Sequence, residues 1–301
     1  MKCVLFILYS LLLSFYFYSC KENKAENIVL KNAPQQQLVD TTRYTYSWLA
    51  SYHPNTSIFN NILPPKGYER SAEEKNSFGA WLQHLPINTT DNTVYLFNGE
   101  KKYNQQAQHV VLDIDIGDRD LQQCADAVMR LRAEYLYTTK QFDKIKFNYT
   151  NGVEIPFSKW SSGFYPKIQG NKVVWVNAQN NSSYKSFKKY LINIFSYAGT
   201  ASLSKEMESV AIESINIGDV FILGGFPGHA VIVVDVAVHP SNGDKCFMLA
   251  QSYMPAQSIH ILKNPNNETL SPWYSLSEIN NEIRTPEWTF DVTQLKRFAI
   301  E

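Results

Sequence analysis

Residues 217–235 have the sequence IGDVFILGGFPGHAVIVVD: a short apolar run, a turn rich in glycine and proline, and a longer apolar run that begins at His229. The residues that follow, from Ala230 to Val234, are all apolar, so they place apolar side chains on both faces of a strand. This pattern is typical of a central strand that is covered on both sides. We therefore expect His229 at the edge of a buried sheet, beside a turn whose glycines let a ligand approach the backbone closely.

A helix is expected over residues 120–137, and it carries the cysteine that His229 can face. Apolar side chains recur there at intervals of three and four residues, the period of one helix face, at Leu121, Cys124, Val128, Leu131 and Tyr135. Asp120 is the expected N-cap, with Gln123 three residues further on in capping-box spacing. Cys124 then lies in the first turn, where the helix dipole stabilises a thiolate and unpaired backbone N–H groups can hold an oxyanion.

This position gives Cys124 alternative roles. As a nucleophile activated by the helix and by His229, it is expected to have a depressed pKa and to react faster than Cys246. As a residue of the apolar helix face, it is instead an inert buried thiol, and the charges of Asp118 and Asp120 oppose its ionisation. A disulfide between Cys124 and Cys246 is a further alternative in an exported protein, and it would remove the nucleophile.

A third polar residue is expected to orient His229, and by its place in the chain Gln251 is the natural candidate. It ends an apolar strand, and its amide oxygen can accept the Nδ1 proton of the histidine. With a two-residue turn at Asn242 and Gly243, however, Gln251 lies opposite Val234 and points away from His229. A longer turn or a bulge would return it to the same face. The alternatives are Gln257, Asp235 and His260.

The composition excludes several function classes. The chain has 301 residues, 44% of them hydrophobic and 14% aromatic, which is enough for a sizeable core. Lys and Arg together number 28, as do Asp and Glu, so a nucleic-acid surface is not expected. His84, His109 and His239 lack the spacing of a metal site, and neither a metal nor a cofactor is predicted.

The N-terminus is expected to direct export. Residues 1–20 combine a positive start with an apolar run too short to span a bilayer, as in a secretory signal peptide. Cys20 follows a small residue and precedes a polar run, which resembles a bacterial lipoprotein signal, so Cys20 is the expected lipidation site. Residues 21–40 are polar and aperiodic and are expected to form a tether. The prediction is a cell-envelope protein, lipid-anchored at the periplasmic or outer-membrane face.

Other elements are predicted from local patterns. Residues 93–97 are expected to form a strand that turns at Asn98 and Gly99 and pairs with a strand over residues 109–116. A second helix is expected over residues 183–197.

Charged residues near the first helix have simple structural interpretations. Arg130 and Glu134 fit an i, i+4 pair on an exposed helix face. Asp113, Asp115 and Asp118 alternate at a strand end, where a carboxylate pair for glycoside cleavage is conceivable. A solvated strand edge explains these three residues more simply.

The residues singled out so far resemble those of the NlpC/P60 peptidases, which have a papain-like fold. The resemblance rests on Cys124 opening a helix, on Gly218 and Asp219 before a strand, and on His229 opening the next strand. It covers roughly residues 115–265. It implies an α+β fold in which an antiparallel sheet packs on the cysteine-bearing helix. The expected parts of the chain are the signal peptide (1–20), the tether (21–40), an N-terminal α/β extension (41–111) and the papain-like domain (112–301).

The resemblance also implies an activity. Cys124, His229 and Gln251 would form the site of a cysteine amidase or peptidase whose substrate is a cell-wall peptide, a muropeptide or a related amide. The chain departs from the family pattern, because Gln123 and Ala125 flank Cys124 where Asp and Ser or Gly are usual. Segments near residues 122–127 and 250–257 also resemble a family of Bacteroidota lipoproteins of unknown function. The alternative function is therefore a non-catalytic lipoprotein that binds peptide, glycan or a protein partner through the same fold.

Overall fold

The computed structural model describes residues 40–299, which form a mixed α and β structure. The expected signal peptide, Cys20 and the tether up to residue 39 lie outside the described residues. The helices are α1 (Ile58–Asn61), α2 (Phe78–Gln83), α3 (Cys124–Thr138), α4 (Phe157–Ser161), α5 (Tyr184–Tyr197) and α6 (Thr200–Glu206). The strands are β1 (Glu69–Arg70), β2 (Gln108–Val111), β3 (Lys146–Asn148), β4 (Glu154–Pro156), β5 (Phe164–Gln169), β6 (Lys172–Asn177), β7 (Met207–Ser209), β8 (Val220–Leu223), β9 (His229–Val238), β10 (Lys245–Gln251), β11 (His260–Leu262), β12 (Tyr274–Ser275), β13 (Glu282–Arg284), β14 (Thr289–Asp291) and β15 (Leu295–Phe298).

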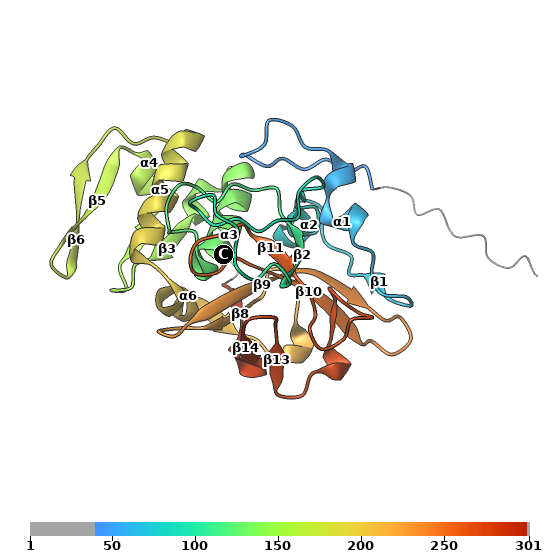
Figure 1. The fold of residues 1–301 in the computed structure, drawn as a ribbon. Coiled ribbons are helices and arrows are strands. Elements are labelled where there is room, and N and C mark those ends of the chain that lie inside the picture. The colour runs from blue at the N-terminus through green and yellow to red at the C-terminus, as the bar shows by residue number, and fades with distance from the viewer. Residues whose placement is uncertain (1–39, 300–301) are drawn as a thin grey trace, which may run out of the picture. The chain divides into compact units, whose positions relative to one another are not determined.

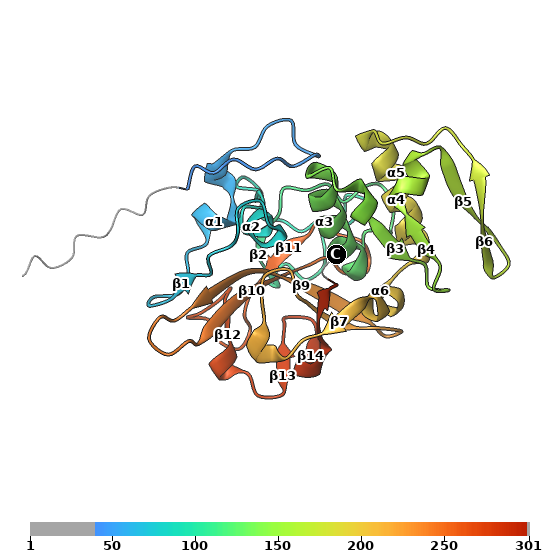
Figure 2. The same ribbon diagram turned by 180° about the vertical axis from the view of Figure 1, so that it is seen from behind.

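The main sheet is antiparallel and has β9 near its centre. Its strand order is β2-β11-β10-β9-β8-β15-β7, with β1 paired to β9 and β12 paired to β10. Figures 1 and 2 show α2 and α3 on one side of this sheet and the β13–β14 hairpin on the other. β9 is buried along nearly all of its length, which confirms the central strand predicted from the apolar run after His229.

Two hydrophobic cores lie on the two faces of β9. Ala230 belongs to the core that contains the apolar residues of α3, which we call the helix core. Val231 belongs to the core that contains Phe290, which we call the Phe290 core. Successive side chains of a strand point to opposite faces, so His229 shares the face of Val231. The contact of its ring with that of Phe290, at 5.8 Å between centroids, agrees with this assignment.

A β-bulge decides which face Gln251 occupies. The register of β9 against β10 shifts by one residue at Val234, which is the extra residue of the bulge. Beyond the shift, Ala250 pairs with Ile232, so Gln251 continues on the face that His229 occupies. The turn between the two strands is longer than two residues, since a backbone hydrogen bond closes it from residue 239 to residue 244. The bulge, one of the two possibilities left open by the sequence, is what returns Gln251 to the histidine.

Residues 41–111 contribute strands to the same sheet. β1 pairs with β9, and β2 pairs with β11, so both strands belong to the main sheet. The boundary expected between the N-terminal extension and the papain-like domain, after residue 111, therefore coincides with the end of β2. The prediction that residues 93–97 pair with residues 109–116 was wrong. Tyr95 makes only an isolated bridge with Lys101, while the second segment supplies β2. The long-range partner of β2 lies in β11, about which the local pattern carried no information.

Both predicted long helices are present, as α3 and α5, but α3 begins later than expected. The backbone N–H of Gln123 donates to Asp126 Oδ2 at 3.1 Å, which places the cap at Gln123. Asp120, the predicted cap, instead accepts the backbone N–H of Ala256 at 2.7 Å. Cys124 is therefore the first residue of α3, closer to the helix N-terminus than the sequence indicated.

A buried charge cluster fixes α3 to its surroundings. Arg130 donates to Glu134 at 2.7 Å, to Gln122 at 2.8 Å and to Asp115 at 2.9 Å. The side chains of Arg130 and Glu134 are 2% and 0% exposed, so the prediction of an exposed pair was wrong. Asp115 also accepts from Lys188 at 2.6 Å, which makes it an ion-pair partner of this cluster.

Gly218 and Asp219, which precede β8, have structural roles. Gly218 has a φ of +91°, and a Cβ on it would lie 3.0 Å from the Phe78 ring. Asp219 is fully buried and receives two hydrogen bonds from the Arg297 guanidinium, at 2.6 and 2.8 Å. The pair thus anchors the start of β8 to β15, the neighbouring strand of the sheet.

Candidate functional site

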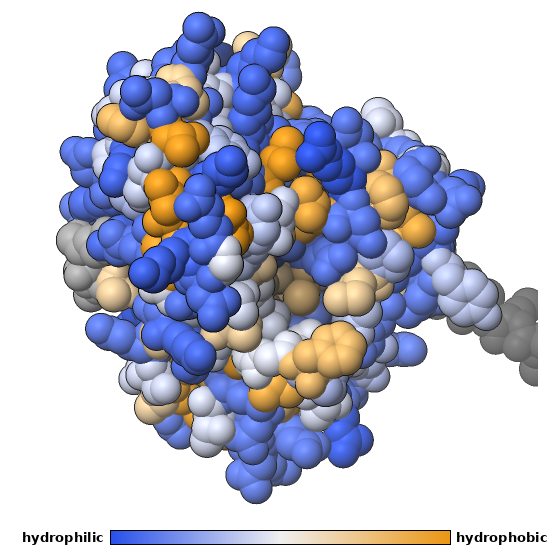
Figure 3. All heavy atoms as spheres, turned by 90° about the vertical axis from the view of Figure 1, so that its left-hand side faces the viewer, coloured by the Kyte–Doolittle hydropathy of each residue, from blue (hydrophilic) through white to orange (hydrophobic). Residues whose placement is uncertain are grey.

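A cavity of about 480 Å³ opens where the N-terminus of α3 meets the turn between β8 and β9. Both Cys124 and His229 line it, and we call it the Cys124 cavity. Its apolar walls include Leu121, Phe195, Phe226, Tyr253, Met254 and Trp288. The molecular face on the side of α5, α6 and β5–β6 is hollowed near its centre, with apolar groups around the hollow (Figure 3). The fold therefore brings the predicted cysteine and histidine, which are far apart in the sequence, to one cavity.

Cys124 lies at the end of β9, although it belongs to α3. It is 9% exposed, and the backbone N–H groups of Ala125 and Ala230 are directed at its sulfur. Because Ala230 directly follows His229, the sulfur is next to the point where the histidine leaves the strand. Cys124 and Cys246 are both free thiols, so the alternative of a disulfide between them does not hold.

The pKa of Cys124 runs against expectation. Burial raises the pKa of its thiol to about 11, and burial likewise raises the pKa of Cys246 to about 11. The prediction of a depressed pKa was wrong, because desolvation of the thiolate outweighs the stabilisation by the backbone N–H groups. Cys124 is therefore a neutral thiol near pH 7, and any reaction that uses it needs a base to remove its proton.

His229 is held by Gln251. Nε2 of His229 lies 2.9 Å from Oε1 of Gln251, and the two residues are 2% and 1% exposed. An amide oxygen only accepts, so the imidazole donates from Nε2 and keeps the lone pair on Nδ1. The structure thus brings Gln251 to His229 as the sequence predicted, but at the other ring nitrogen.

Three aromatic rings surround the imidazole of His229. The ring centroids of Tyr253, Trp288 and Phe290 lie at 4.6, 5.3 and 5.8 Å from that of the histidine. Burial in this environment lowers the pKa of His229 to about 4. The histidine is therefore neutral over the physiological pH range and can accept a proton there.

Cys124 and His229 approach the cavity from opposite faces of the sheet. The cysteine comes from the helix-core side through α3, whereas the histidine comes from the Phe290-core side of β9. The two side chains share a cavity only because His229 is the first residue of its strand, where the sheet ends.

Gln251 also connects His229 to a buried ion pair that the sequence did not reveal. Nε2 of Gln251 donates to Glu287 Oε2 at 2.9 Å. The same carboxylate pairs with Lys102, a residue only 8% exposed, and accepts from Asn104 at 3.2 Å. Lys102 and Glu287 lie outside the named strands and are 185 residues apart, so no local pattern pointed to either of them.

In the part of the chain that the structure describes, Asp235, Gln257 and His260 form no hydrogen bond with His229. Asp235 accepts from Arg70 and Gln83 at 2.6 and 2.8 Å, on the helix-core side of the sheet. His260 approaches Gln251 instead, with 3.4 Å between the His260 Nε2 and Gln251 Nε2 atoms. Gln257 forms an isolated β-bridge with Leu96.

The turn that leads into His229 requires glycine at residue 228. A Cβ on Gly228 would lie 2.4 Å from the carbonyl oxygen of Gly225 and 2.5 Å from Thr200 Oγ1. Thr200 itself donates to that carbonyl oxygen at 3.1 Å, which ties the turn to the first residue of α6. The close packing fixes the backbone from which His229 projects.

The mouth of the Cys124 cavity is apolar and carries no positive charge. Phe226 is 95% exposed and Met254 is 56% exposed, and both line the cavity. Asp120 and Asp126 are its acidic residues, and among residues 40–299 no lysine or arginine lines it. Burial raises the pKa of Asp126 well above its usual range. These walls favour an uncharged ligand with apolar groups over a ligand with a carboxylate near the cysteine.

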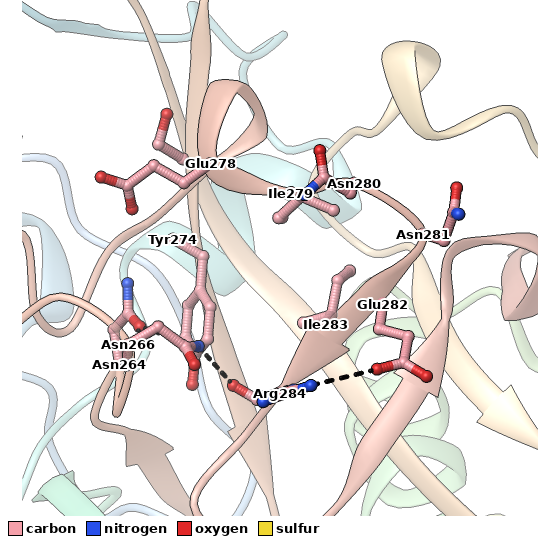
Figure 4. Close-up of a pocket in the computed structure, with 11 residues that line it drawn as sticks. Asn264, Asn266, Tyr274, Glu278, Ile279, Asn280, Asn281, Glu282, Ile283 and Arg284 are labelled. Carbon is pink, nitrogen blue, oxygen red and sulfur yellow. Dashed lines mark hydrogen bonds and ion pairs between the residues drawn. The ribbon is translucent and has the colours of Figure 1, made fainter.

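A second cavity, of about 460 Å³, lies apart from this site (Figure 4). Its polar side chains serve the surrounding loops: Asn266 donates to the carbonyl oxygen of Arg284 at 2.9 Å, and Arg284 pairs with Glu282 at 3.6 Å. No cysteine or histidine lines it, so the chemistry predicted from the sequence belongs to the Cys124 cavity.

Comparison with known proteins gives a family but no activity. A family model described as a domain of unknown function (4846) matches residues 58–297. No curated protein and no solved structure matches the chain. Within residues 40–299, no group of His, Cys, Asp and Glu is arranged to hold a metal ion. No helix in that part of the chain has both the length and the apolar character needed to cross a bilayer.

Proposed function

The chain belongs to the family described as a domain of unknown function (4846), and from the Cys124 cavity we propose that it is a cysteine-dependent amidase or peptidase. Cys124 is the nucleophile, His229 the base, and Gln251 the residue that orients the base. The observation that carries the proposal is the hydrogen bond from His229 Nε2 to Gln251 Oε1. It leaves the Nδ1 lone pair of the neutral histidine free of Gln251, and both His229 and Cys124 line the cavity.

The reaction follows from a neutral thiol and a neutral imidazole. Nδ1 of His229 takes the thiol proton while the sulfur of Cys124 attacks the amide carbonyl, which forms the S–C bond. Backbone N–H groups at the N-terminus of α3 stabilise the tetrahedral oxyanion. The imidazolium then gives its proton to the leaving amine as the C–N bond breaks. Water, deprotonated by His229, hydrolyses the thioester, releases the carboxylic acid and restores the thiol.

The packing of the sheet on α3 supports a papain-like arrangement of the NlpC/P60 type, and we include that finer fold assignment in the proposal. The substrate class is a peptide or related amide of the cell envelope. The apolar walls of the cavity, which include no lysine or arginine among residues 40–299, favour amides that carry no carboxylate next to the scissile bond. Export and a lipid on Cys20 remain proposals from the sequence pattern of residues 1–40.

Mass spectrometry of the intact protein tests this function. We expect that the wild-type protein, mixed with peptides released from cell walls and quenched in acid, gains an acyl group on Cys124 and releases amine products. A Cys246→Ala variant is the matched control and should form the same adduct, because Cys246 is buried away from the cavity. An adduct on Cys246, or products without any dependence on Cys124, would contradict the assignment of the nucleophile.

The pH dependence of turnover follows from the lowered pKa of His229. Only the unprotonated imidazole can accept the thiol proton, and burial moves its pKa from the ordinary 6.5 to about 4. We therefore expect kcat/KM to stay high on acidification and to fall only near pH 4. Circular dichroism at each pH separates this loss from acid unfolding. An acidic limb centred near 6.5 in the folded protein would show that His229 is not buried as described.

A binding protein without turnover is the second candidate. The raised pKa of Cys124 and its small exposure favour it, because both reduce the reactivity of the thiol. In that case the same peptides would bind with equal affinity to the wild-type protein and to Cys124→Ala, and neither protein would form products.

A further inference from the structure

We propose that Glu287, acting through Gln251, determines which ring nitrogen of His229 carries the proton. Glu287 is then a positioning residue that keeps Nδ1 of the histidine unprotonated. The assignment of the tautomer rests on the hydrogen bonds around Gln251, whereas its catalytic consequence rests on the proposed function.

The orientation of the Gln251 amide follows from its neighbours. Glu287 presents a carboxylate oxygen at 2.9 Å from one end of the amide, and a carboxylate only accepts hydrogen bonds. That end must therefore be the NH₂ group, and the carbonyl oxygen must be the end that lies 2.9 Å from Nε2 of His229.

His260 supports the same orientation independently. Its Nδ1 lies 2.8 Å from the carbonyl oxygen of Ser258, which only accepts, so Nδ1 of His260 carries the proton. Burial lowers the pKa of His260 to about 4, and Nε2 of this neutral ring is then an acceptor. That acceptor is 3.4 Å from the same nitrogen of Gln251, so both neighbours of this nitrogen are acceptors.

Lys102 and Asn104 hold Glu287 in place. Lys102 pairs with Glu287 Oε2, and Asn104 donates to Glu287 Oε1 at 3.2 Å. Lys102 donates to the same oxygen, Oε2, that accepts from Gln251, and Asn104 holds the other oxygen of the carboxylate. The ion pair therefore supplies a fixed acceptor, in a region where Lys102 and Gln251 are both less than a tenth exposed.

The opposite orientation would disable the base. If the amide of Gln251 turned by 180°, its NH₂ group would face Nε2 of His229, and that nitrogen would have to accept. The proton of the neutral ring would then lie on Nδ1, where it blocks transfer from Cys124. Glu287 thus acts on the reaction without contacting the cysteine, the histidine ring or the cavity.

Nitrogen NMR of the full chain with ¹⁵N-labelled histidine tests this inference without any substrate. We expect His229 of the wild-type protein to show a single tautomer with the proton on Nε2. The double variant Lys102→Met/Glu287→Met removes the acceptor and its counter-ion together, and we expect it to populate the Nδ1–H tautomer of His229 to at least about a tenth. Its kcat/KM should fall in proportion to the fraction of the protein that has lost the Nε2–H tautomer, since a histidine with the proton on Nδ1 cannot accept the thiol proton.

Two further variants give the inference its controls. Lys102→Met/Glu287→Gln keeps an acceptor oxygen at residue 287 without the charge, and it should restore the Nε2–H tautomer. Glu282→Met removes an exposed carboxylate of the β13–β14 hairpin and should change neither the tautomer nor the rate.

The outcomes separate the inference from the proposed function. Wild-type His229 with its proton on Nδ1 overturns the inference, and this measurement needs no variant to fold. An unchanged tautomer in a folded Lys102→Met/Glu287→Met protein overturns it as well. If the tautomers respond as expected while no amide is hydrolysed, the inference stands and only the proposed activity fails.

Discussion

Cys124→Ala is expected to lower kcat/KM for amide hydrolysis by at least about 10⁴-fold, as for the loss of a nucleophile in other acyl-transfer sites. Alanine keeps the start of α3 and its backbone N–H groups but cannot form the thioester. His229→Ala should reduce the rate by a similar factor, because the thiol, with a pKa of about 11, is neutral without a base at physiological pH. The double variant should be no worse than either single variant, since the two residues act as a unit.

Initial rates and thermal unfolding of each variant check this result together. Cys246→Ala is the matched control, because it removes the other described thiol and leaves the Cys124 cavity untouched. Retention of more than about a tenth of the wild-type rate in folded Cys124→Ala would exclude covalent catalysis by this residue, given the far larger loss that such a mechanism implies.

Arg130→Met is expected to lower the free energy of unfolding by about 3–5 kcal/mol, the usual loss when one partner of a buried ion pair is removed. Glu134 is fully buried, so its carboxylate would be left without its counter-ion, and Gln122 and Asp115 would each lose a hydrogen bond. Through Gln122, which lies two residues before Cys124, the cluster also holds the segment that leads into α3.

Urea unfolding followed by circular dichroism measures this loss. Arg284→Met is the control, because its pair with Glu282 is exposed and should contribute less than about 1 kcal/mol. The double variant Arg130→Met/Glu134→Leu should recover much of the loss, because it removes the buried charge that Arg130→Met leaves unpaired. Equal effects of Arg130→Met and Arg284→Met would show that the cluster is hydrated and adds little stability.

The sequence predicted those parts of the fold that depend on local periodicity. The apolar run after His229 required a strand buried on both faces, and the spacing around Val128 and Leu131 required a helix. The partner of each strand was less accessible. Residues 109–116 carried a clear strand pattern, yet the strand that forms there, β2, pairs with β11, which lies almost 150 residues further along the chain.

The candidate site was predictable only in part. Cys124 and His229 were found because their residue types and positions in local elements are chemically distinctive. Gln251 reaches His229 because of a bulge at Val234, which the sequence of the turn does not predict. The nitrogen of His229 that bonds Gln251 is Nε2, whereas Nδ1 was predicted. Glu287 was missed altogether, since an isolated glutamate in a loop has no signal until the fold brings it to Gln251.

The pKa values show a different limit of sequence reasoning. A helix N-terminus lowers the pKa of a cysteine when the thiol is hydrated, and the sequence supplied the helix. The degree of burial comes from tertiary packing, and it raises the pKa of Cys124 by more than the backbone N–H groups of Ala125 and Ala230 lower it. Two effects of opposite sign could not be ranked before the exposure of the sulfur was known.

The entry of Cys124 and His229 from opposite faces of β9 has a consequence for assays. Each residue depends on a different core, α3 on the helix core and the histidine ring on the Phe290 core. Under the proposed function, turnover would therefore require both cores to be ordered, whereas the far-ultraviolet signal of the helices reports mainly the helix core. On that proposal, a preparation in which only the Phe290 core is disordered would keep its native helix content but lose its activity. Specific activity would then be the stricter measure of correctly folded protein.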